Sequence, residues 1–162
     1  MVDFSPVTKK DLAAIIDIYN YYILNSTASF HSEKLKKKDL EEIIPISHPV
    51  YPSFLIKDRN EIIGYCFIHQ YKKRQAYDRS AELSIYLKPE FTGKGIGAGA
   101  LSHLEAAAKK SGIHVLVGTL CGENYASIRL LEKSGYSKCA QLKNIGEKFG
   151  KILDVVVYQK EI

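Results

Sequence analysis

The glycine-rich stretch at residues 93–97, Gly-Lys-Gly-Ile-Gly, constrains this chain more than any other feature. It follows an alternating, strand-like run at residues 81–87 and precedes a helical pattern that places Leu101, Leu104 and Ala108 on one face. Glycines let the main chain approach a ligand closely and leave N–H groups exposed, while the helix behind them directs its positive end the same way. The stretch therefore predicts a phosphate-binding loop at the start of a helix.

Two other kinds of phosphate-binding loop fit less well. A P-loop requires Gly-x-x-x-x-Gly-Lys-Ser/Thr, which no window of the chain supplies. Residues 95–100 match the dinucleotide-binding pattern Gly-x-Gly-x-x-Ala, and Glu123 could mimic its ribose-binding acid. In that fold, however, the first glycine follows its strand almost immediately, whereas residues 88–94 separate Leu87 from Gly95. The gap disfavours a dinucleotide-dependent oxidoreductase.

The remaining patterns predict a single mixed α/β domain over residues 1–162. Helical periodicity and turn residues predict the order α-α-β-β-β-α-β-α-β-β, with no internal repeat. Before the glycine-rich stretch we expect helices at 9–24 and 36–44 and strands at 53–57, 62–70 and 81–87. After its helix, which Gly112 ends, we expect a strand at 114–120, a helix capped by Asn124 and ended by Gly135, and strands at 136–142 and 152–159.

Charge and hydropathy indicate which classes of partner the chain is expected to bind. The formal net charge of +5 suits an anionic ligand, but the basic runs at residues 36–38 and 72–74 are short and form no continuous stripe, so we expect no nucleic-acid partner. No segment approaches the ~20 apolar residues of a membrane helix, and we expect no membrane partner. Because the first residues lack a secretory pattern, we expect a cytoplasmic location.

The cysteines predict neither a metal site nor a disulfide framework. Cys66, Cys121 and Cys139 are odd in number and widely spaced, and no Cys-x-x-Cys pair occurs. Each has apolar neighbours in sequence, so we expect buried, unreactive side chains.

Two segments together resemble the acetyl-CoA-binding motifs of GNAT acetyltransferases. The run at residues 83–98 matches a strand, a connector and Gln/Arg-x-x-Gly-x-Gly/Ala opening a helix, with Thr92 where the family prefers Gln or Arg. Residues 124–136 look like the family's second motif, at the proper distance along the chain. The resemblance implies a mostly antiparallel, twisted central sheet flanked by helices, and an enzyme that uses acetyl-CoA.

The resemblance narrows to the phosphinothricin acetyltransferase-like branch and covers almost the whole chain. It is carried chiefly by residues 72–82, by Ser84-Ile-Tyr86 after them, and by shorter matches at 18–20, 26–30 and 146–155. That branch acetylates the α-amino group of small amino-acid analogues such as phosphinothricin, methionine sulfone or methionine sulfoximine, and its members are generally homodimers. A small-molecule amine substrate and a homodimer are therefore expected here.

The resemblance also implies site residues. Glu82 matches the catalytic carboxylate, and the chemistry needs one because an α-amino group, with a pKa of about 7.7–8, attacks only when neutral. The main chain of Ile85, Tyr86 and Leu87 would pair with the pantetheine arm, near which Asn124 would lie. The pyrophosphate would be bound by main-chain N–H groups of Gly93, Lys94, Gly95, Ile96, Gly97 and Ala98. The substrate would be bound by Phe30, Lys72, Arg74 and Tyr77.

Other interpretations stay open at this point. Leu131 stands where the superfamily has Tyr and the branch has His, so no general acid is assigned. An enzyme of the same fold that acetylates a protein N-terminus or a lysine is the first alternative, and a non-catalytic acyl-CoA-binding module is the second. Without the resemblance, residues 72–74 would be a solvated loop and Phe30 a core side chain. The sequence does not identify the physiological amine.

Overall fold

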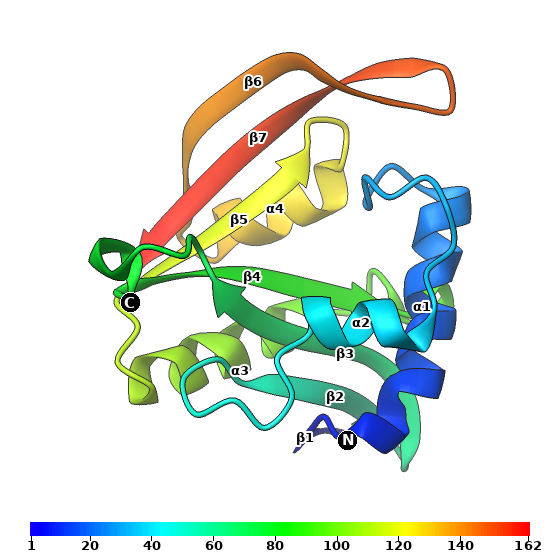
Figure 1. Ribbon diagram of the computed structural model, residues 1–162, viewed down its shortest axis with the longest axis vertical. Coiled ribbons are helices and arrows are strands. Elements are labelled where there is room, and N and C mark those ends of the chain that lie inside the picture. The colour runs from blue at the N-terminus through cyan, green and yellow to red at the C-terminus, as the bar shows by residue number, and fades with distance from the viewer.

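A seven-stranded sheet crosses the computed structural model, which describes residues 1–162 (Figure 1). The strand order is β1-β2-β3-β4-β5-β7-β6, and every neighbouring pair is antiparallel except β4 and β5. The strands are β1 (Val2–Pro6), β2 (Ser53–Asp58), β3 (Glu61–Gln70), β4 (Ser80–Leu87), β5 (Val115–Cys121), β6 (Ser137–Lys148) and β7 (Lys151–Glu161).

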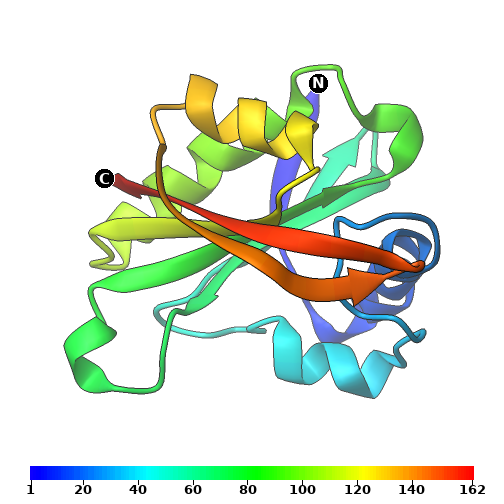
Figure 2. The ribbon, with the colours of Figure 1, turned by 90° about the horizontal axis from the view of Figure 1, so that it is seen from above.

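Helices cover both faces of the sheet, so that two hydrophobic cores form (Figure 2). The first pair, α1 (Leu12–Asn25) and α2 (Lys37–Ile43), packs on one face, and the second pair, α3 (Ile96–Lys110) and α4 (Tyr125–Lys133), packs on the other. The predicted mixed α/β class, with a mostly antiparallel sheet flanked by helices, is confirmed.

The helices after the glycine-rich stretch form for the predicted reasons. In α3, Leu101, Leu104 and Ala108 are buried, and Gly112 follows the helix with a φ of +82°. The α4 helix begins after Asn124, whose side-chain oxygen accepts a hydrogen bond from the N–H of Ser127 at 3.3 Å. Each helix therefore starts and stops where its capping residues indicate.

Three sequence predictions need correction. Strand β1 was not predicted, because it is a short edge strand whose last residue is Pro6, and an edge position tolerates proline. The helix expected at residues 9–24 is divided into a 3₁₀ turn (Lys9–Asp11) and α1. Strand β6 continues to Lys148, well beyond residue 142, because it pairs with β7 almost to the tip of their hairpin.

The cysteine prediction holds for two residues and is wrong for the third. Cys66 and Cys121 are buried, whereas Cys139 is exposed on β6 at the edge of the sheet and donates to the carbonyl of Val157. No group of three or more His, Cys, Asp or Glu side chains is arranged to hold a metal ion. None of the helices combines the length and the hydropathy needed to cross a membrane.

The parallel strands β4 and β5 separate partway along their length. They pair only where residues 80–82 of β4 meet residues 115–117 of β5. Beyond this point β4 keeps its partner β3 and β5 keeps its partner β7, but the edges that face each other are unpaired. This opening positions the site described next.

Candidate active site

A cavity of about 460 Å³ lies at the opening between β4 and β5. Its walls come from the second half of β4, the glycine loop at residues 92–98, the end of β5 and the helix α4. Eight of the ten residues predicted to bind acetyl-CoA line it: Ile85, Tyr86, Leu87, Gly93, Gly95, Gly97, Ala98 and Asn124.

The other two predicted cofactor residues do not line the cavity. Lys94 directs its ammonium group over the ring of Phe91, at 5.1 Å from the ring centre, and Ile96 packs against the core beneath α3. Both side chains point away from the cavity because successive residues of the loop and first helical turn face different directions. Only their main-chain groups remain available to a ligand there.

The glycine loop leaves a row of main-chain donors without protein acceptors. Gly93 and Gly95 have φ angles of +71° and +80°, in the left-handed region that favours glycine. No N–H group of residues 93–97 donates to a main-chain or side-chain acceptor, whereas that of Ala98 donates to the carbonyl of Gly95 at 3.2 Å. These free donors, at the positive end of α3, fit an anionic group such as a pyrophosphate.

Two hydroxyl groups near the loop have structural partners. Thr92, which stands where a Gln or Arg was expected, donates to the carbonyl of Pro89 at 2.7 Å. Tyr22 of α1 lines the cavity and donates to the carbonyl of Leu87 at 2.6 Å. No sequence motif indicated Tyr22, because nothing in its pattern distinguishes it from the other aromatic residues of α1.

Glu82 lies on β4 just before the strand loses its partner β5. Its side chain is 25% exposed, and it does not line the large cavity. Strand alternation places Ser84 and Tyr86 on the same face as Glu82. These two residues line both the large cavity and a second one of about 180 Å³ beneath α1 and α2. Glu82 is thus two residues along the strand from Ser84, which lines both cavities.

The second cavity is lined mainly by aromatic and aliphatic side chains, and no lysine or arginine contributes to it. Burial is the main cause that raises the pKa of Tyr19, Tyr65 and Tyr86, so these phenols stay neutral near pH 7. The hydroxyl of Tyr19 lies 2.6 Å from Nδ1 of His31 and accepts from Ser29. This pocket offers neutral hydrogen-bonding groups within an apolar wall.

The four predicted substrate residues line neither cavity. Lys72, Arg74 and Tyr77 are exposed in the loop between β3 and β4, where Tyr77 packs edge-on against Tyr71. Phe30 is exposed in the loop after α1 and contacts Gly146 of β6. The two loops lie at opposite ends of the molecule in both views (Figures 1 and 2), so a single chain does not bring all four residues together.

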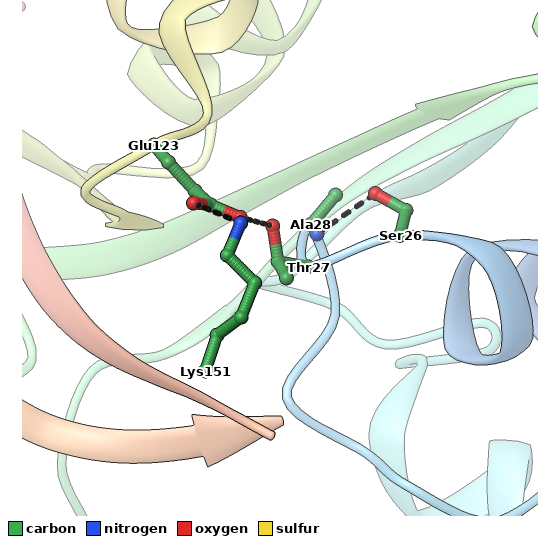
Figure 3. Close-up of polar contacts among 5 residues, drawn as sticks. All are labelled: Ser26, Thr27, Ala28, Glu123 and Lys151. Carbon is green, nitrogen blue, oxygen red and sulfur yellow. Dashed lines mark hydrogen bonds and ion pairs between the residues drawn. The ribbon is translucent and has the colours of Figure 1, made fainter. Parts of the chain in front are cut away.

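A polar cluster holds the loop after α1 beside the large cavity (Figure 3). The carboxylate of Glu123 accepts from the hydroxyl of Thr27 at 2.8 Å and from the ammonium group of Lys151 at 2.8 Å. The hydrogen bond from Lys151 is the main reason that the pKa of Glu123 is lowered. Because Ser26 and Ala28 of this loop line the cavity, the cluster shapes its wall. Glu123 therefore has structural partners and does not act as a ribose-binding acid.

Lys148 ties the same loop from the β6–β7 hairpin. Its ammonium group is buried and donates to the carbonyls of Ser26 and Ser29 at 2.7 and 2.6 Å. Burial lowers the pKa of Lys148. Periodicity did not indicate this role of Lys148, because a lysine near the tip of a hairpin is usually a solvated charge.

Leu131 stands at the position where related enzymes have a Tyr or a His that could donate a proton. It is buried, lines the large cavity and covers Gly118 so closely that a Cβ added there would lie 2.7 Å from its Cδ1. An apolar side chain donates no proton, so the structure assigns no general acid at this position. Cys121 is buried, and no side-chain base is hydrogen-bonded to its thiol.

The acetyltransferase (GNAT) domain matches residues 5–157 of the chain. The chain therefore belongs to the GNAT acetyltransferase family and is an acetyl-CoA-dependent N-acetyltransferase. The antiparallel sheet, with a glycine loop opening a helix beside two separated strands, is the GNAT fold.

Within the family, the chain is similar to three proteins of known name. An L-methionine sulfoximine/L-methionine sulfone acetyltransferase of Salmonella typhimurium is 29% identical over 95% of this chain and 91% of its own length. A phosphinothricin acetyltransferase of Sinorhizobium meliloti, solved with acetyl-CoA, is 29% identical with a TM-score of 0.94, over 99% and 88% of the two chains. A ribosomal-protein-alanine N-acetyltransferase of Brucella melitensis is 28% identical with a TM-score of 0.90, over 99% of each chain.

Proposed function

We propose that this enzyme transfers the acetyl group of acetyl-CoA to the α-amino group of a small amino acid or amino-acid analogue. One observation carries the proposal: the unpaired edge of β4 lies beside the free N–H groups of the glycine loop, and Glu82 stands just before that edge. The names of the Salmonella and Sinorhizobium relatives support an acceptor of the methionine sulfoximine, methionine sulfone or phosphinothricin type.

Acetyl-CoA would extend across the large cavity. The main chain of residues 85–87 would pair with the pantetheine arm as an added strand, with Asn124 nearby. The N–H groups of residues 93–98 would bind the pyrophosphate, with the positive end of α3 behind them. One N–H group of β4 would polarise the thioester carbonyl and stabilise the developing oxyanion. The residues present fit this co-substrate.

The transfer would occur by direct attack in a ternary complex. As the amine nitrogen bonds to the thioester carbon, Glu82 accepts its proton, directly or through one water. The C–S bond then breaks, which releases the N-acetyl product and the thiolate of coenzyme A. A thiol pKa near 8.5 makes this thiolate a competent leaving group without a general acid. The buried Cys121, which has no base, gives no support to an acyl-enzyme.

Lys72, Arg74 and Tyr77 would bind the acidic end of the acceptor. Their loop connects β3 to β4 at the end of the hairpin that carries Glu82. A guanidinium fork matches the geometry of a carboxylate or phosphinate, which favours Arg74 for that contact. Phe30 lies at the opposite end of the molecule and is not part of this proposed contact.

A protein N-terminus is the second candidate acceptor, and the Brucella relative is the observation in its favour. A panel of free amino acids, their sulfone, sulfoximine and phosphinothricin analogues, an alanine-terminated peptide and a lysine peptide separates the two. Acetylation is followed by release of free thiol. We expect turnover on the free amino-acid analogues. Turnover on the alanine peptide alone would contradict the proposal.

We also propose a homodimer, on the strength of the family resemblance. Large apolar side chains are exposed on the β6–β7 hairpin, a feature common at protein–protein interfaces: Leu142, Ile145, Phe149 and Ile152. Light scattering at micromolar concentration should give twice the chain mass of 18.2 kDa. A monomer under these conditions would contradict the proposal.

A further inference from the structure

His69 of β3 lies directly across from Glu82 of β4. The two residues are partners in the antiparallel register, so their side chains share one face of the sheet. Nε2 of His69 is 3.9 Å from Oε2 of Glu82, and the two side chains are 35% and 25% exposed. His69 also lines the second cavity, which adjoins the face of Glu82.

The other ring nitrogen determines which form His69 adopts when it is neutral. Nδ1 lies 3.0 Å from the main-chain carbonyl oxygen of Gln70. A carbonyl oxygen only accepts, so Nδ1 must carry the hydrogen of this bond. In the neutral imidazole the lone pair is then on Nε2, the nitrogen that faces the Glu82 carboxylate.

We propose that His69 is a positioning residue that receives the proton from Glu82 after acetyl transfer. The inference rests on the proposed function. Glu82 takes one proton from the amine nitrogen as the N–C bond forms and the C–S bond breaks. The protonated carboxyl passes it to Nε2 of neutral His69, through one water or a small side-chain rotation, because 3.9 Å exceeds a direct hydrogen bond. Nε2 of the imidazolium then releases the proton to solvent, to which the side chain is 35% exposed, and both groups return to their starting states.

The groups that surround the pair are mostly apolar or neutral. His69 is the only basic side chain within 4.0 Å of the Glu82 carboxylate, and Lys72, Lys73 and Arg74 form no ion pair with it. The titratable groups that α1, β3 and β4 add to the adjoining cavity are the phenols of Tyr19, Tyr65 and Tyr86, which are neutral donors. From β5 and α2 the neighbours are Val117, Leu40, Ile43 and Ile44, which do not titrate.

Rate–pH profiles of four proteins test the inference: wild type, His69→Gln, Glu82→Gln and the double variant. We expect His69→Gln to lower turnover roughly tenfold, less than the 10²–10⁴-fold typical of losing a general base. The shape of its rate–pH profile should differ from that of wild type, and imidazole buffer should restore its rate but not accelerate wild type. In the Glu82→Gln background, His69→Gln should cause no further loss, because the two residues act in series. The KM for acetyl-CoA should be unchanged.

Two further experiments keep the result unambiguous. His114→Gln, at an exposed histidine outside both cavities, should retain the wild-type profile, and His69→Asn should repeat the loss if His69→Gln folds poorly. By NMR, the neutral His69 ring of the wild-type protein should carry its hydrogen on Nδ1, because Nδ1 donates to the main-chain carbonyl of Gln70.

Three results would overturn the inference: an unaltered rate–pH profile for His69→Gln, additive losses in the double variant, or a neutral His69 ring that carries its hydrogen on Nε2. The NMR measurement of the His69 tautomer needs no substrate. A wild-type enzyme that acetylates none of the amines would therefore contradict the proposed function and leave this separate result standing.

Discussion

Glu82 is the residue on which the proposed chemistry depends most. Glu82→Gln keeps the shape of the side chain but removes the base, so we expect turnover to fall by about 10²–10⁴-fold. Acetyl-CoA affinity should hardly change, because main-chain groups further along β4 and in the glycine loop would bind it. A higher pH should restore part of the rate, since more substrate amine is then neutral. Steady-state kinetics from pH 6 to 9 and calorimetry with acetyl-CoA measure both effects.

Two outcomes would revise this role. Wild-type turnover of a folded Glu82→Gln enzyme at pH 7 would exclude Glu82 as the base. A loss confined to the KM of the amine would make Glu82 a residue that binds the substrate ammonium group.

Gly97 offers a residue-scale test of the glycine loop. It lines the large cavity, and a Cβ there would lie 3.2 Å from Cδ2 of Leu130. Gly97→Glu places a side chain and a negative charge where a phosphate is expected, so acetyl-CoA binding should be abolished. Gly99→Glu is the matched control, because Gly99 is exposed, does not line the cavity and has no atom within 4 Å of an added Cβ. Equal affinities of the two folded variants in calorimetry would reject the phosphate assignment.

At the scale of elements, two lysines connect the loop after α1 to the β6–β7 hairpin. Lys148→Met leaves the half-buried carbonyl of Ser26 and the buried carbonyl of Ser29 without donors, and we expect it to cost about 1–3 kcal/mol of unfolding free energy. Lys151→Met removes an ion pair at a more exposed position, and we expect it to cost much less, because water and salt screen such a pair. Urea unfolding of the two variants compares them, and equal destabilisation would contradict the special role of Lys148.

The loop held by these lysines borders the large cavity, so its order should affect binding as well as stability. We expect Lys148→Met to raise the KM for acetyl-CoA more than Lys151→Met does, because it releases the backbone of Ser26 and Ser29 directly. Hydrogen exchange of residues 26–30 should be faster in the Lys148→Met protein.

At the scale of the whole molecule, His103 makes stability depend on pH. Its ring on α3 stacks on Phe4 of β1 at 4.2 Å and meets Phe54 of β2 edge-on at 4.4 Å, and its buried Nε2 has no hydrogen-bond partner. Burial, followed by the charge of Lys110, lowers the pKa of His103 below its ordinary value of 6.5. The unfolded chain therefore binds this proton at a higher pH than the folded protein does.

The stabilisation from neutral His103 is complete above pH 6.5 and is lost as the pH falls from there through the lowered folded-state pKa. His103→Phe removes this titration, so we expect the variant to gain stability relative to wild type between pH 7 and pH 5. Thermal unfolding across that range measures the difference in stability between the variant and wild type. The contributions of the other histidines are the same in both proteins and drop out of this difference. A difference that does not vary with pH would contradict the expectation.

The sequence by itself determined the local elements and the class of ligand. Turn and capping residues act through their own neighbours in the chain, so Gly112, Asn124 and Gly135 marked helix ends correctly. The spacing of Gly93, Gly95 and Gly97 before α3 indicated a phosphate-binding loop for the same reason, since the loop is built from its own main chain. The sequence did not predict the edge strand β1, because a strand of five residues that ends in proline has almost no periodic pattern.

The tertiary structure decided what depends on contacts between distant segments. The 460 Å³ cavity exists because β4 and β5 separate after three paired residues, and strand pairing is not encoded within either strand. Tyr22, Lys148 and the pair of Glu82 with His69 acquire their roles only when α1, the β6–β7 hairpin and the β3–β4 register bring them together. Long-range register and burial set the direction and the desolvation of a side chain, and these physical properties distinguish a site residue from the same residue on a solvated surface.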